Sequence, residues 1–435
     1  MYDPIMFVLP ESIDRGQYVT CTYYAEGQTD DLLLRAGSIA VEQTTGTWVP
    51  VPRETPAVRG RSVGRVIAVH EIPAYEFELP EEKERRFVFQ IAFPFINIGA
   101  QIPELLTTVM GNISMAGKIK LLDIEFPAVF TSGFQGPKFG IDGLRMLLDV
   151  PKRPLLLGMI KPCTGLSPQD LGELVYELGM GGIDIVKDDE LLGDPAFCRV
   201  EDRLARAVAS VKRVYEKTGK TVLYAINVTD RPDLMHQKAR RCVAAGANSL
   251  MVNAHATGPA ALQMLAEDPE IYVPIISHPA FAGTMFESPF SGLSSHLVLG
   301  KLQRLAGADI VVYPSSYGKV TILKEREMRI SQTLKSPFHH LKPVFPTPSA
   351  GMHPGLVPVL VANHGLDLVV GAGGGIHGHP QGATAGVRGM LQAIQAVTEG
   401  IPLEDAAKEH EELAIGLKLW GTGGSGNNRL YELKR

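Results

Sequence analysis

Cysteine is scarce in this chain, and the few cysteines lie far apart. Only four occur in 435 residues, namely Cys21, Cys163, Cys198 and Cys242. Their spacing matches neither a zinc-binding pattern nor a disulfide framework. The sequence also lacks a charged-then-apolar leader and any apolar run near 20 residues, which argues against export and membrane insertion. We therefore expect a cytoplasmic protein in a reducing compartment.

An excess of positive charge is also absent. The net charge of −5 argues against a nucleic-acid-binding surface, although a local basic pocket for a small anion remains compatible with it. Hydrophobic residues make up 45% and charged residues 20%, as is typical of globular proteins. The length allows more than one domain and a large core.

Residues 1–136 predict a small α+β domain. The pattern indicates strands at 17–26, 65–72, 86–93 and 119–126, with helices at 30–43 and 103–111. This strand–helix–strand–strand–helix–strand order is typical of a ferredoxin-like fold.

Residues 137–435 contain eight short apolar runs with helical stretches between them. The runs begin at residues 155, 183, 222, 250, 274, 309, 343 and 367. They are rich in Val, Ile and Leu without alternation, as expected of strands buried on both faces. Eight such units predict a (β/α)₈ barrel, with the helices after Pro402 packed outside. An open doubly wound sheet would have fewer strands, and its early GxGxxG fingerprint is missing.

Reactive side chains follow the predicted barrel strands. In such barrels, catalytic residues cluster at the carboxyl ends of the strands. These positions include Lys161, Lys187, Asp189, Glu190, His278, Lys319, Ser349 and Gly351. A single strand-end lysine is more often a salt-bridge partner, but several such groups on one rim predict a reacting site.

The segment "GGIDIVKDDE" offers a metal site. Strand alternation places Lys187 and Asp189 on one side and Asp188 on the other, while Glu190 lies in the loop. Two carboxylates are a sparse set for Mg²⁺, which also keeps waters and takes substrate oxygens. If CO₂ converted Lys187 to a carbamate, it would supply a third anionic ligand. The alternative is an acidic cluster neutralised by one lysine.

The segment "GAGGG", residues 371–375, ends the eighth predicted strand and precedes a helix. Glycine amides can approach phosphate oxygens closely, and the eighth strand of a barrel is a common phosphate location. This loop, including Gly373 and Gly374, therefore predicts a phosphate site.

These residues, in this order and over nearly the whole chain, resemble the RuBisCO superfamily, which contains ribulose-bisphosphate carboxylase and RuBisCO-like proteins. The resemblance implies that Lys187 is carbamylated and that Asp189 and Glu190 complete the ligands of Mg²⁺. It implies that Lys161 moves a proton, and we expect neighbouring positive charge to keep this lysine partly neutral. By the same resemblance, His278 is an active-site histidine and Lys319 lies at the tip of a mobile loop.

The segment "EQTTGTW" resembles one that a neighbouring subunit lends to the site in this superfamily. The resemblance implies that Glu42, Thr47, Trp48 and Asn112 come from the partner chain. A homodimer would then be the minimal active unit.

Three positions depart from the carboxylases, and the last two of them belong to one phosphate pocket. Cys163 replaces a lysine, Pro279 an arginine and Val312 a histidine, and neither proline nor valine binds phosphate through its side chain. Ser349 alone remains there. The other pocket matches the superfamily at Thr47, Trp48, Lys319, Gly351, Gly373 and Gly374. We therefore expect a monophosphorylated substrate and no CO₂ fixation.

Three functions fit this resemblance. The one we prefer from sequence is decarboxylation of an oxo-sugar-acid phosphate, of the 3-oxo-isoapionate 4-phosphate type. The alternative is the 2,3-diketo-5-methylthiopentyl-1-phosphate enolase of methionine salvage, which "LAEDPEIYVPIISHPA" and "PSAGMHP" resemble. That enolase has a lysine where this chain has Asn112, and it lacks one at the position of Lys319. A non-catalytic binding protein is disfavoured, because Lys161 and the "KDDE" residues are retained.

Overall fold

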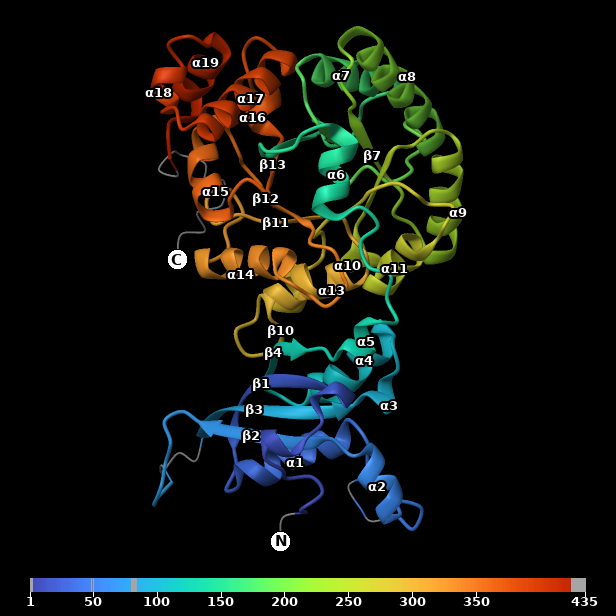
Figure 1. The fold of residues 1–435 in the computed structure, drawn as a ribbon, viewed down its shortest axis with the longest axis vertical. Coiled ribbons are helices and arrows are strands. Elements are labelled where there is room, and N and C mark those ends of the chain that lie inside the picture. The colour runs from blue at the N-terminus through green and yellow to red at the C-terminus, as the bar shows by residue number, and fades with distance from the viewer. Residues whose placement is uncertain (1–2, 48, 50, 80–83, 424–435) are drawn as a thin grey trace. The chain divides into compact units, whose positions relative to one another are not determined.

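The computed structural model describes residues 3–47, 49, 51–79 and 84–423. The chain divides into two compact units (Figure 1). One comprises Met1–Gln135 together with Ala282–Val298, and the other comprises Gly136–Phe281 and Leu299–Arg435. The second unit is thus interrupted by a segment that belongs to the first, which no composition change in the sequence indicates.

The first unit contains a five-stranded sheet in the order β10-β4-β1-β3-β2. Its strands are β1 (Tyr18–Gln28), β2 (Arg65–Glu71), β3 (Glu84–Pro94), β4 (Ile119–Glu125) and β10 (Gly292–Leu293). β1 pairs antiparallel with both β3 and β4, and β2 pairs antiparallel with β3, which confirms the predicted ferredoxin-like arrangement. The short β10 lies parallel to β4 and was not predicted, because two residues give no periodic signal.

Short helices complete this unit. The two predicted from the sequence are α1, which begins after the N-cap Asp31, and α4. The helices are α1 (Leu32–Glu42), α2 (Pro56–Ser62), α3 (Phe95–Ile98), α4 (Ile102–Met110), α5 (Ala128–Thr131) and α12 (Gly283–Phe286), with one-turn helices at Pro10–Ser12, Arg15–Gln17 and Asn112–Met115.

The second unit is an eight-stranded parallel barrel, as the sequence predicted. The strand order is β12-β11-β9-β8-β7-β6-β5-β13, and β12 also lies beside β13, which closes the ring. The strands are β5 (Leu155–Met159), β6 (Ile185–Lys187), β7 (Leu223–Asn227), β8 (Ser249–Val252), β9 (Ile275–Ser277), β11 (Ile310–Pro314), β12 (Phe345–Ser349) and β13 (Val369–Ala372). Each coincides with one of the eight apolar runs.

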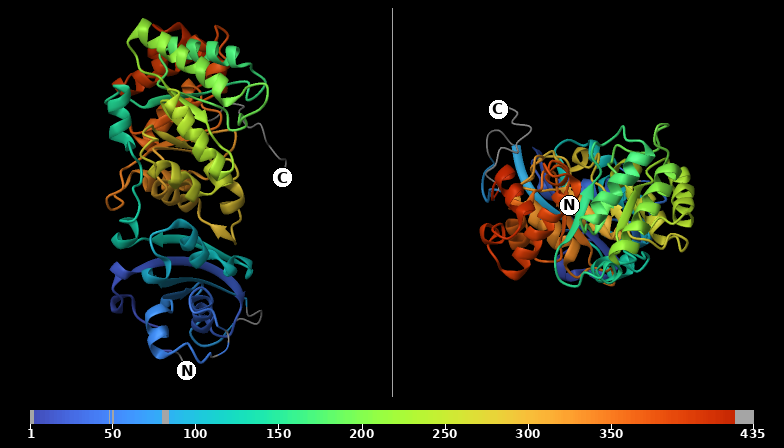
Figure 2. Two further views of the ribbon diagram at one scale, coloured as in Figure 1. Left: turned by 90° about the vertical axis from the view of Figure 1, so that its right-hand side faces the viewer. Right: turned by 90° about the horizontal axis from the view of Figure 1, so that it is seen from above.

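Helices surround these strands, as two further views show (Figure 2). Several begin with a proline in the first turn, where its missing N–H costs nothing. The helices are α6 (Gly140–Leu148), α7 (Pro168–Met180), α8 (Val200–Thr218), α9 (Pro232–Ala244), α10 (Ala254–Thr257), α11 (Pro259–Glu267), α13 (Leu302–Leu305), α14 (Lys324–Lys335), α15 (Val357–His364), α16 (Gly374–His377), α17 (Ala383–Glu399), α18 (Leu403–Ala406) and α19 (Glu411–Trp420), with a π-helical turn at Leu297–Lys301 and a 3₁₀ turn at Pro354–Leu356. No described helix combines the length and apolar character needed to cross a membrane.

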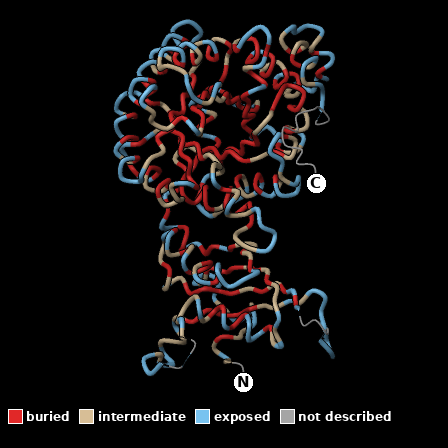
Figure 3. The backbone as a smooth tube through the Cα atoms, turned by 180° about the vertical axis from the view of Figure 1, so that it is seen from behind, coloured by how far each residue is buried: buried red, intermediate tan, exposed pale blue. Residues whose placement is uncertain are grey.

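The barrel interior is filled by apolar side chains from its strands. Leu157, Leu223, Ile276 and Phe345 are among those with at most 1% of their surface exposed. Burial of such a side chain contributes about 1.5–3 kcal/mol. The buried backbone follows the strands, and the exposed backbone follows the outer helices and loops (Figure 3). The barrel is therefore a packed core, and only its ends are open to a ligand.

A buried ion pair fixes the chain just after β6. The carboxylate of Asp188 accepts hydrogen bonds from Arg203 Nε at 2.9 Å and from the Asn227 amide at 2.9 Å, and it also accepts one from the Tyr224 hydroxyl. Neither member of the Asp188–Arg203 pair is exposed. The Asp188 side chain points toward Arg203 of the outer helix α8. Strand alternation therefore turns the side chains of Lys187 and Asp189 to the opposite side, as predicted.

Removing Arg203 should destabilise the protein strongly. In an Arg203→Ala variant the buried Asp188 carboxylate loses its cation, and breaking such a pair costs about 3–5 kcal/mol. The change in the free energy of unfolding is measurable by urea denaturation. Arg213 lies on the same helix and pairs with Glu173 at a surface where both side chains are about half exposed. Arg213→Ala should therefore cost less than about 1 kcal/mol. Equal losses in the two variants would contradict this assignment.

Candidate active site at the carboxyl end of the barrel

Lys187 is the last residue of β6, and its side chain is completely buried. Its Nζ donates to the Asp188 carbonyl at 2.8 Å and lies 3.4 Å from Glu190 Oε2. Burial lowers the pKa of Lys187, the positive charge of Lys161 adds to this effect, and the carboxylates of Glu190 and Asp189 oppose it. The site therefore favours the neutral amine more than water does.

Lys161 follows the neighbouring strand β5. Its Nζ donates to Asp189 Oδ2 at 2.6 Å and to Cys163 Sγ at 2.9 Å. Burial lowers the pKa of Lys161, but the hydrogen bond and charge of Asp189 outweigh it, so the net shift is upward. The expectation of a partly neutral Lys161 is thus wrong for this arrangement, because its nearest charged partner is a carboxylate and not a cation.

His278 follows β9 and contacts the same acids. Its Nε2 lies 3.3 Å from Glu190 Oε2, and its Nδ1 accepts from the Ala280 amide at 3.2 Å. The proton of the neutral ring is therefore on Nε2, the ring nitrogen that lies nearest to the Glu190 carboxylate. Burial, followed by the charges of Lys187, His255 and Lys161, holds the pKa of His278 well below its usual range. The histidine is a neutral hydrogen-bond donor at physiological pH.

Two asparagines hold the backbone of the acidic segment. Asn227 Nδ2 lies 3.4 Å from the carbonyl oxygens of both Asp189 and Glu190, and Asn253 Nδ2 donates to the Glu190 carbonyl at 3.0 Å. The sequence places these residues at the ends of β7 and β8 but does not indicate this role. They act as positioning residues, because they fix the loop from which both carboxylates project.

The donor set fits a hard divalent cation if Lys187 contributes an anion. Among the described residues, no group of three His, Cys, Asp or Glu side chains is arranged to hold a metal. Asp189 and Glu190 provide two carboxylates, and Lys187 lies next to both. A carbamate on its amine would replace a positive charge by a negative one and complete three oxygen donors, the ligand type that Mg²⁺ prefers. The buried lysine with a lowered pKa fits this chemistry, since CO₂ reacts with the neutral amine.

The predicted phosphate residues gather at the ends of β11, β12 and β13. A Cβ atom added to Gly373 would lie 3.3 Å from Lys161 Cε, so the glycine loop is in contact with that lysine. Gly351 has a φ of +97°, and the Lys319 amide donates to the Ala350 carbonyl at 2.7 Å. The Lys319 side chain is exposed. Ser349 is buried, and its Oγ donates to the Thr347 carbonyl at 3.2 Å.

A buried glutamate holds the base of the loop that carries Lys319. Glu327 of α14 accepts from Ser315 Oγ at 3.2 Å and from the Ser316 amide at 2.5 Å. Its carboxylate is also 2.9 Å from His364 Nε2, and both side chains of that pair are at most 1% exposed. The sequence did not indicate Glu327, because a helix glutamate normally faces solvent.

The predicted residues of the first unit divide into two sets. Asn112 Nδ2 donates to Glu42 Oε1 at 3.0 Å, so the fold joins two predicted residues that are 70 positions apart. Both are exposed. Thr47 Oγ1 instead contacts Glu54 Oε2 at 3.4 Å. Trp48 lies outside the described residues.

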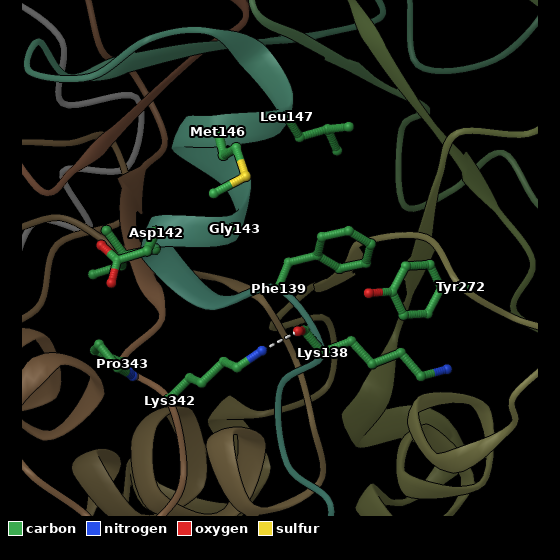
Figure 4. A pocket seen from close by; sticks show the side chains of 10 residues that line it. Lys138, Phe139, Asp142, Gly143, Met146, Leu147, Tyr272, Lys342 and Pro343 are labelled. Carbon is green, nitrogen blue, oxygen red and sulfur yellow. Dashed lines mark hydrogen bonds between the residues drawn. The ribbon is translucent and has the colours of Figure 1, made fainter.

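Cavities at the opposite end of the barrel do not contribute to this site. One, of about 480 Å³, is lined by α6 and by residues that precede β9 and β12, including Phe139, Tyr272 and Lys342 (Figure 4). Another, of about 570 Å³, is lined by Lys152, Arg153 and residues that precede β7. Both are at the amino-terminal end of the strands, where barrel residues serve stability more than catalysis.

Comparison with known proteins agrees with this architecture. Residues 8–130 match the N-terminal domain of the ribulose bisphosphate carboxylase large chain, and residues 140–420 match its catalytic domain. The fold and site define a two-domain barrel protein of the RuBisCO type. The chain belongs to the RuBisCO large-chain family, within its RuBisCO-like branch.

Several relatives cover nearly the whole chain. A ribulose bisphosphate carboxylase-like protein of Archaeoglobus fulgidus is 49% identical, with 94% of this chain and 95% of the relative covered. A 2,3-diketo-5-methylthiopentyl-1-phosphate enolase of Geobacillus kaustophilus is 42% identical, with 93% and 98% covered. The crystal structure of a rubisco-like protein (MtnW) from Alicyclobacillus acidocaldarius has a TM-score of 0.86 at 40% identity, with 92% and 99% covered. A dimeric archaeal Rubisco from Hyperthermus butylicus has a TM-score of 0.85 at 30% identity, with 95% and 98% covered.

The two site lysines should have opposite effects on stability. The lowered pKa of Lys187 means that the folded state opposes its protonation, so its burial costs stability at every pH below the ordinary lysine pKa. Lys187→Met should raise the free energy of unfolding by about 1–3 kcal/mol at neutral pH. The raised pKa of Lys161 has the opposite sign, and Lys161→Met should lower that free energy by about 1–3 kcal/mol, because Asp189 loses its partner.

Urea denaturation at neutral pH, in buffer depleted of CO₂ and divalent metal, measures both values. A loss of stability in Lys187→Met comparable to that in Lys161→Met would contradict the assignment of a strained, buried lysine.

Proposed function

We propose that this protein is a Mg²⁺-dependent enolase that acts on a monophosphorylated diketone or keto-sugar derivative. The observation that carries the proposal is the 2.6 Å contact between Lys161 Nζ and Asp189 Oδ2, beside the buried Lys187. It places a proton-transferring group next to the acids that would hold the metal. The relative from Geobacillus kaustophilus supports enolisation, which the sequence alone had ranked second to decarboxylation.

Each residue of the site has a distinct role in the proposed reaction. Carbamylated Lys187, Asp189 and Glu190 would hold Mg²⁺, which when bound stabilises negative charge developing on substrate oxygens. Lys161 would accept the proton of the substrate carbon as an amine, the form that its raised pKa disfavours while it is paired with Asp189, and would return a proton as an ammonium. His278 lies beside Glu190 with an uncharged ring, because burial and the neighbouring cations hold its pKa well below the usual range. The enediolate is thus made by this chain's lysine in a site whose acids are fixed by hydrogen bonds.

A single phosphate is expected on the substrate. Val312 is 2% exposed and packs in the barrel interior, so the pocket that carboxylases complete with a histidine has an apolar wall here. Pro279 adds neither charge nor donor. Lys319, Gly351, Gly373 and Gly374 remain for one phosphate, with Ser349 nearby. Ribulose 1,5-bisphosphate would leave one phosphate without a cation, which argues against carboxylation.

Decarboxylation of an oxo-sugar-acid phosphate is the second candidate. It is favoured by Asn112 and Lys319, two site positions at which the resemblance sets this chain apart from the methionine-salvage enolase. Both reactions share the enediolate and the same metal site. They differ in whether a proton or CO₂ leaves the substrate carbon.

We further propose a homodimer as the active unit, in which Glu42, Thr47, Trp48 and Asn112 complete the site of the partner subunit. The hydrogen bond between Asn112 and Glu42 supports a shared role for these two exposed residues. No disulfide joins any of the four cysteines, all of which lie in the part of the chain that the structure describes, and we propose a reducing, cytoplasmic location.

The enolase and decarboxylase proposals predict different products. With Mg²⁺ and CO₂ supplied, 2,3-diketo-5-methylthiopentyl 1-phosphate should exchange its enolisable proton with solvent deuterium, as NMR can follow. Lys161→Met should slow this exchange at least 100-fold, because general acid–base catalysis is worth about 10²–10⁴ in rate. Release of CO₂ from 3-oxo-isoapionate 4-phosphate, without exchange on the diketone, would instead favour the decarboxylase. If neither reaction takes place, the result would indicate a non-catalytic binding protein.

Lys319 should act on the phosphate rather than on the rest of the substrate. Loss of one charge-assisted contact costs about 1.5–3 kcal/mol, so Lys319→Ala should weaken binding of the phosphorylated diketone about 10- to 100-fold. The dephosphorylated analogue should bind equally to wild type and variant, as titration calorimetry would show. Lys324 lies five residues later in the sequence, at the start of α14, and Lys324→Ala serves as the control. Equal losses for both compounds would refute the phosphate assignment.

Shared sites predict complementation between inactive subunits. Lys187→Ala and Asn112→Ala should each be inactive as homodimers. After proven subunit exchange, a mixture should regain up to about a quarter of wild-type activity, because half of the dimers are mixed and each has one intact site. Lack of recovery would mean that each chain builds its own site.

A further inference from the structure

Two buried polar atoms at the end of β8 have no hydrogen-bond partner. They are Asn253 Oδ1 and His255 Nε2, in side chains that are 9% and 5% exposed. The amide orientation of Asn253 is fixed, because Nδ2 donates to the Glu190 carbonyl and leaves Oδ1 free. Unpaired buried polar atoms are uncommon in proteins and cost free energy, so two at one strand end call for a ligand.

Their position is next to the reacting groups and opposite the phosphate loop. β8 pairs with β9, and the His278 amide donates to the Val252 carbonyl at 2.9 Å. The segment that follows β8, which contains Asn253 and His255, therefore starts next to His278. In the closed order of eight strands, β8 is four strands from β13 in either direction. A substrate whose phosphate is bound at Gly373 and Gly374 would therefore extend across the acids toward β8.

The chemistry of the two atoms selects their ligand. Asn253 Oδ1 can only accept a hydrogen bond, whereas His255 Nε2 donates or accepts according to its tautomer. Burial lowers the pKa of His255 to about 4, so the ring is uncharged at neutral pH and offers no cation to a second phosphate. A hydroxyl group both donates and accepts, so it matches an acceptor oxygen and a ring nitrogen in either tautomer. An alkyl or thioether group would leave both unpaired.

We propose that Asn253 and His255 form a subsite for a hydroxyl group at the end of the substrate that is remote from its phosphate. This inference rests on the proposed function and refines it, since it ranks a hydroxylated keto-sugar phosphate above the thioether diketone as a substrate of the same monophosphate site. A site built to bind a hydroxyl discriminates against an analogue without one, because the site's polar atoms then stay unpaired.

The test uses two compounds that differ by one hydroxyl, xylulose 5-phosphate and 1-deoxyxylulose 5-phosphate. Each is titrated calorimetrically into the full-length protein with saturating Mg²⁺ and CO₂. Wild type should bind xylulose 5-phosphate about tenfold more tightly. His255→Phe should remove this preference by weakening only the hydroxylated compound. His255→Gln, which retains a polar atom near the position of Nε2, should restore most of it.

The outcomes separate this inference from the proposed function. Equal affinities of wild type for the two compounds would overturn the hydroxyl subsite alone. An equal loss of affinity for both compounds in His255→Phe would do the same, provided that thermal unfolding shows His255→Gln to be folded. Failure of wild type to bind either pentulose phosphate would contradict both the subsite and the proposed monophosphate site.

Discussion

The burial of Lys187 between Asp189 and Glu190 is the constraint on which the rest of the site depends. A lysine with no exposed surface at the end of a barrel strand is costly as a cation, and its pKa is lowered accordingly. The nearby carboxylates reduce this cost without removing it. Conversion of the amine to a carbamate would remove the buried cation and require a metal to balance three anions. The same burial thus opposes the protonated form of Lys187 and would favour the proposed carbamate.

The surrounding structure serves to hold this arrangement in place. Asp188 is held on the outer side by Arg203, so its neighbours must face the barrel end. Asn227 and Asn253 fix the backbone that follows, and His278 Nε2 lies 3.3 Å from the Glu190 carboxylate. Glu327 plays a comparable role for the loop of Lys319. Each contact is made by a residue at a strand end or on an outer helix, which leaves the barrel interior to apolar packing.

The barrel could be predicted from the sequence because its strands are buried on both faces, and Val, Ile and Leu then form continuous runs. The acidic segment could be predicted because alternation along β6 determines which side chains share a side. The segment Ala282–Val298 could not, because its contacts with the first unit are non-local and its strand is only two residues long. The protonation of Lys161 was misjudged because it depends on a 2.6 Å distance to Asp189 that spacing does not encode. Asn253, His255 and Glu327 were missed for the same reason, since their roles arise from three-dimensional contacts.

Lys187 is the residue proposed to become anionic, and ¹³C NMR with ¹³C-labelled CO₂ tests this most directly. In the presence of Mg²⁺, wild type should show a carbamate carbonyl resonance that disappears in Lys187→Ala and persists in Lys161→Met. No such resonance in wild type at saturating Mg²⁺, or its persistence in Lys187→Ala, would contradict the proposed metal site.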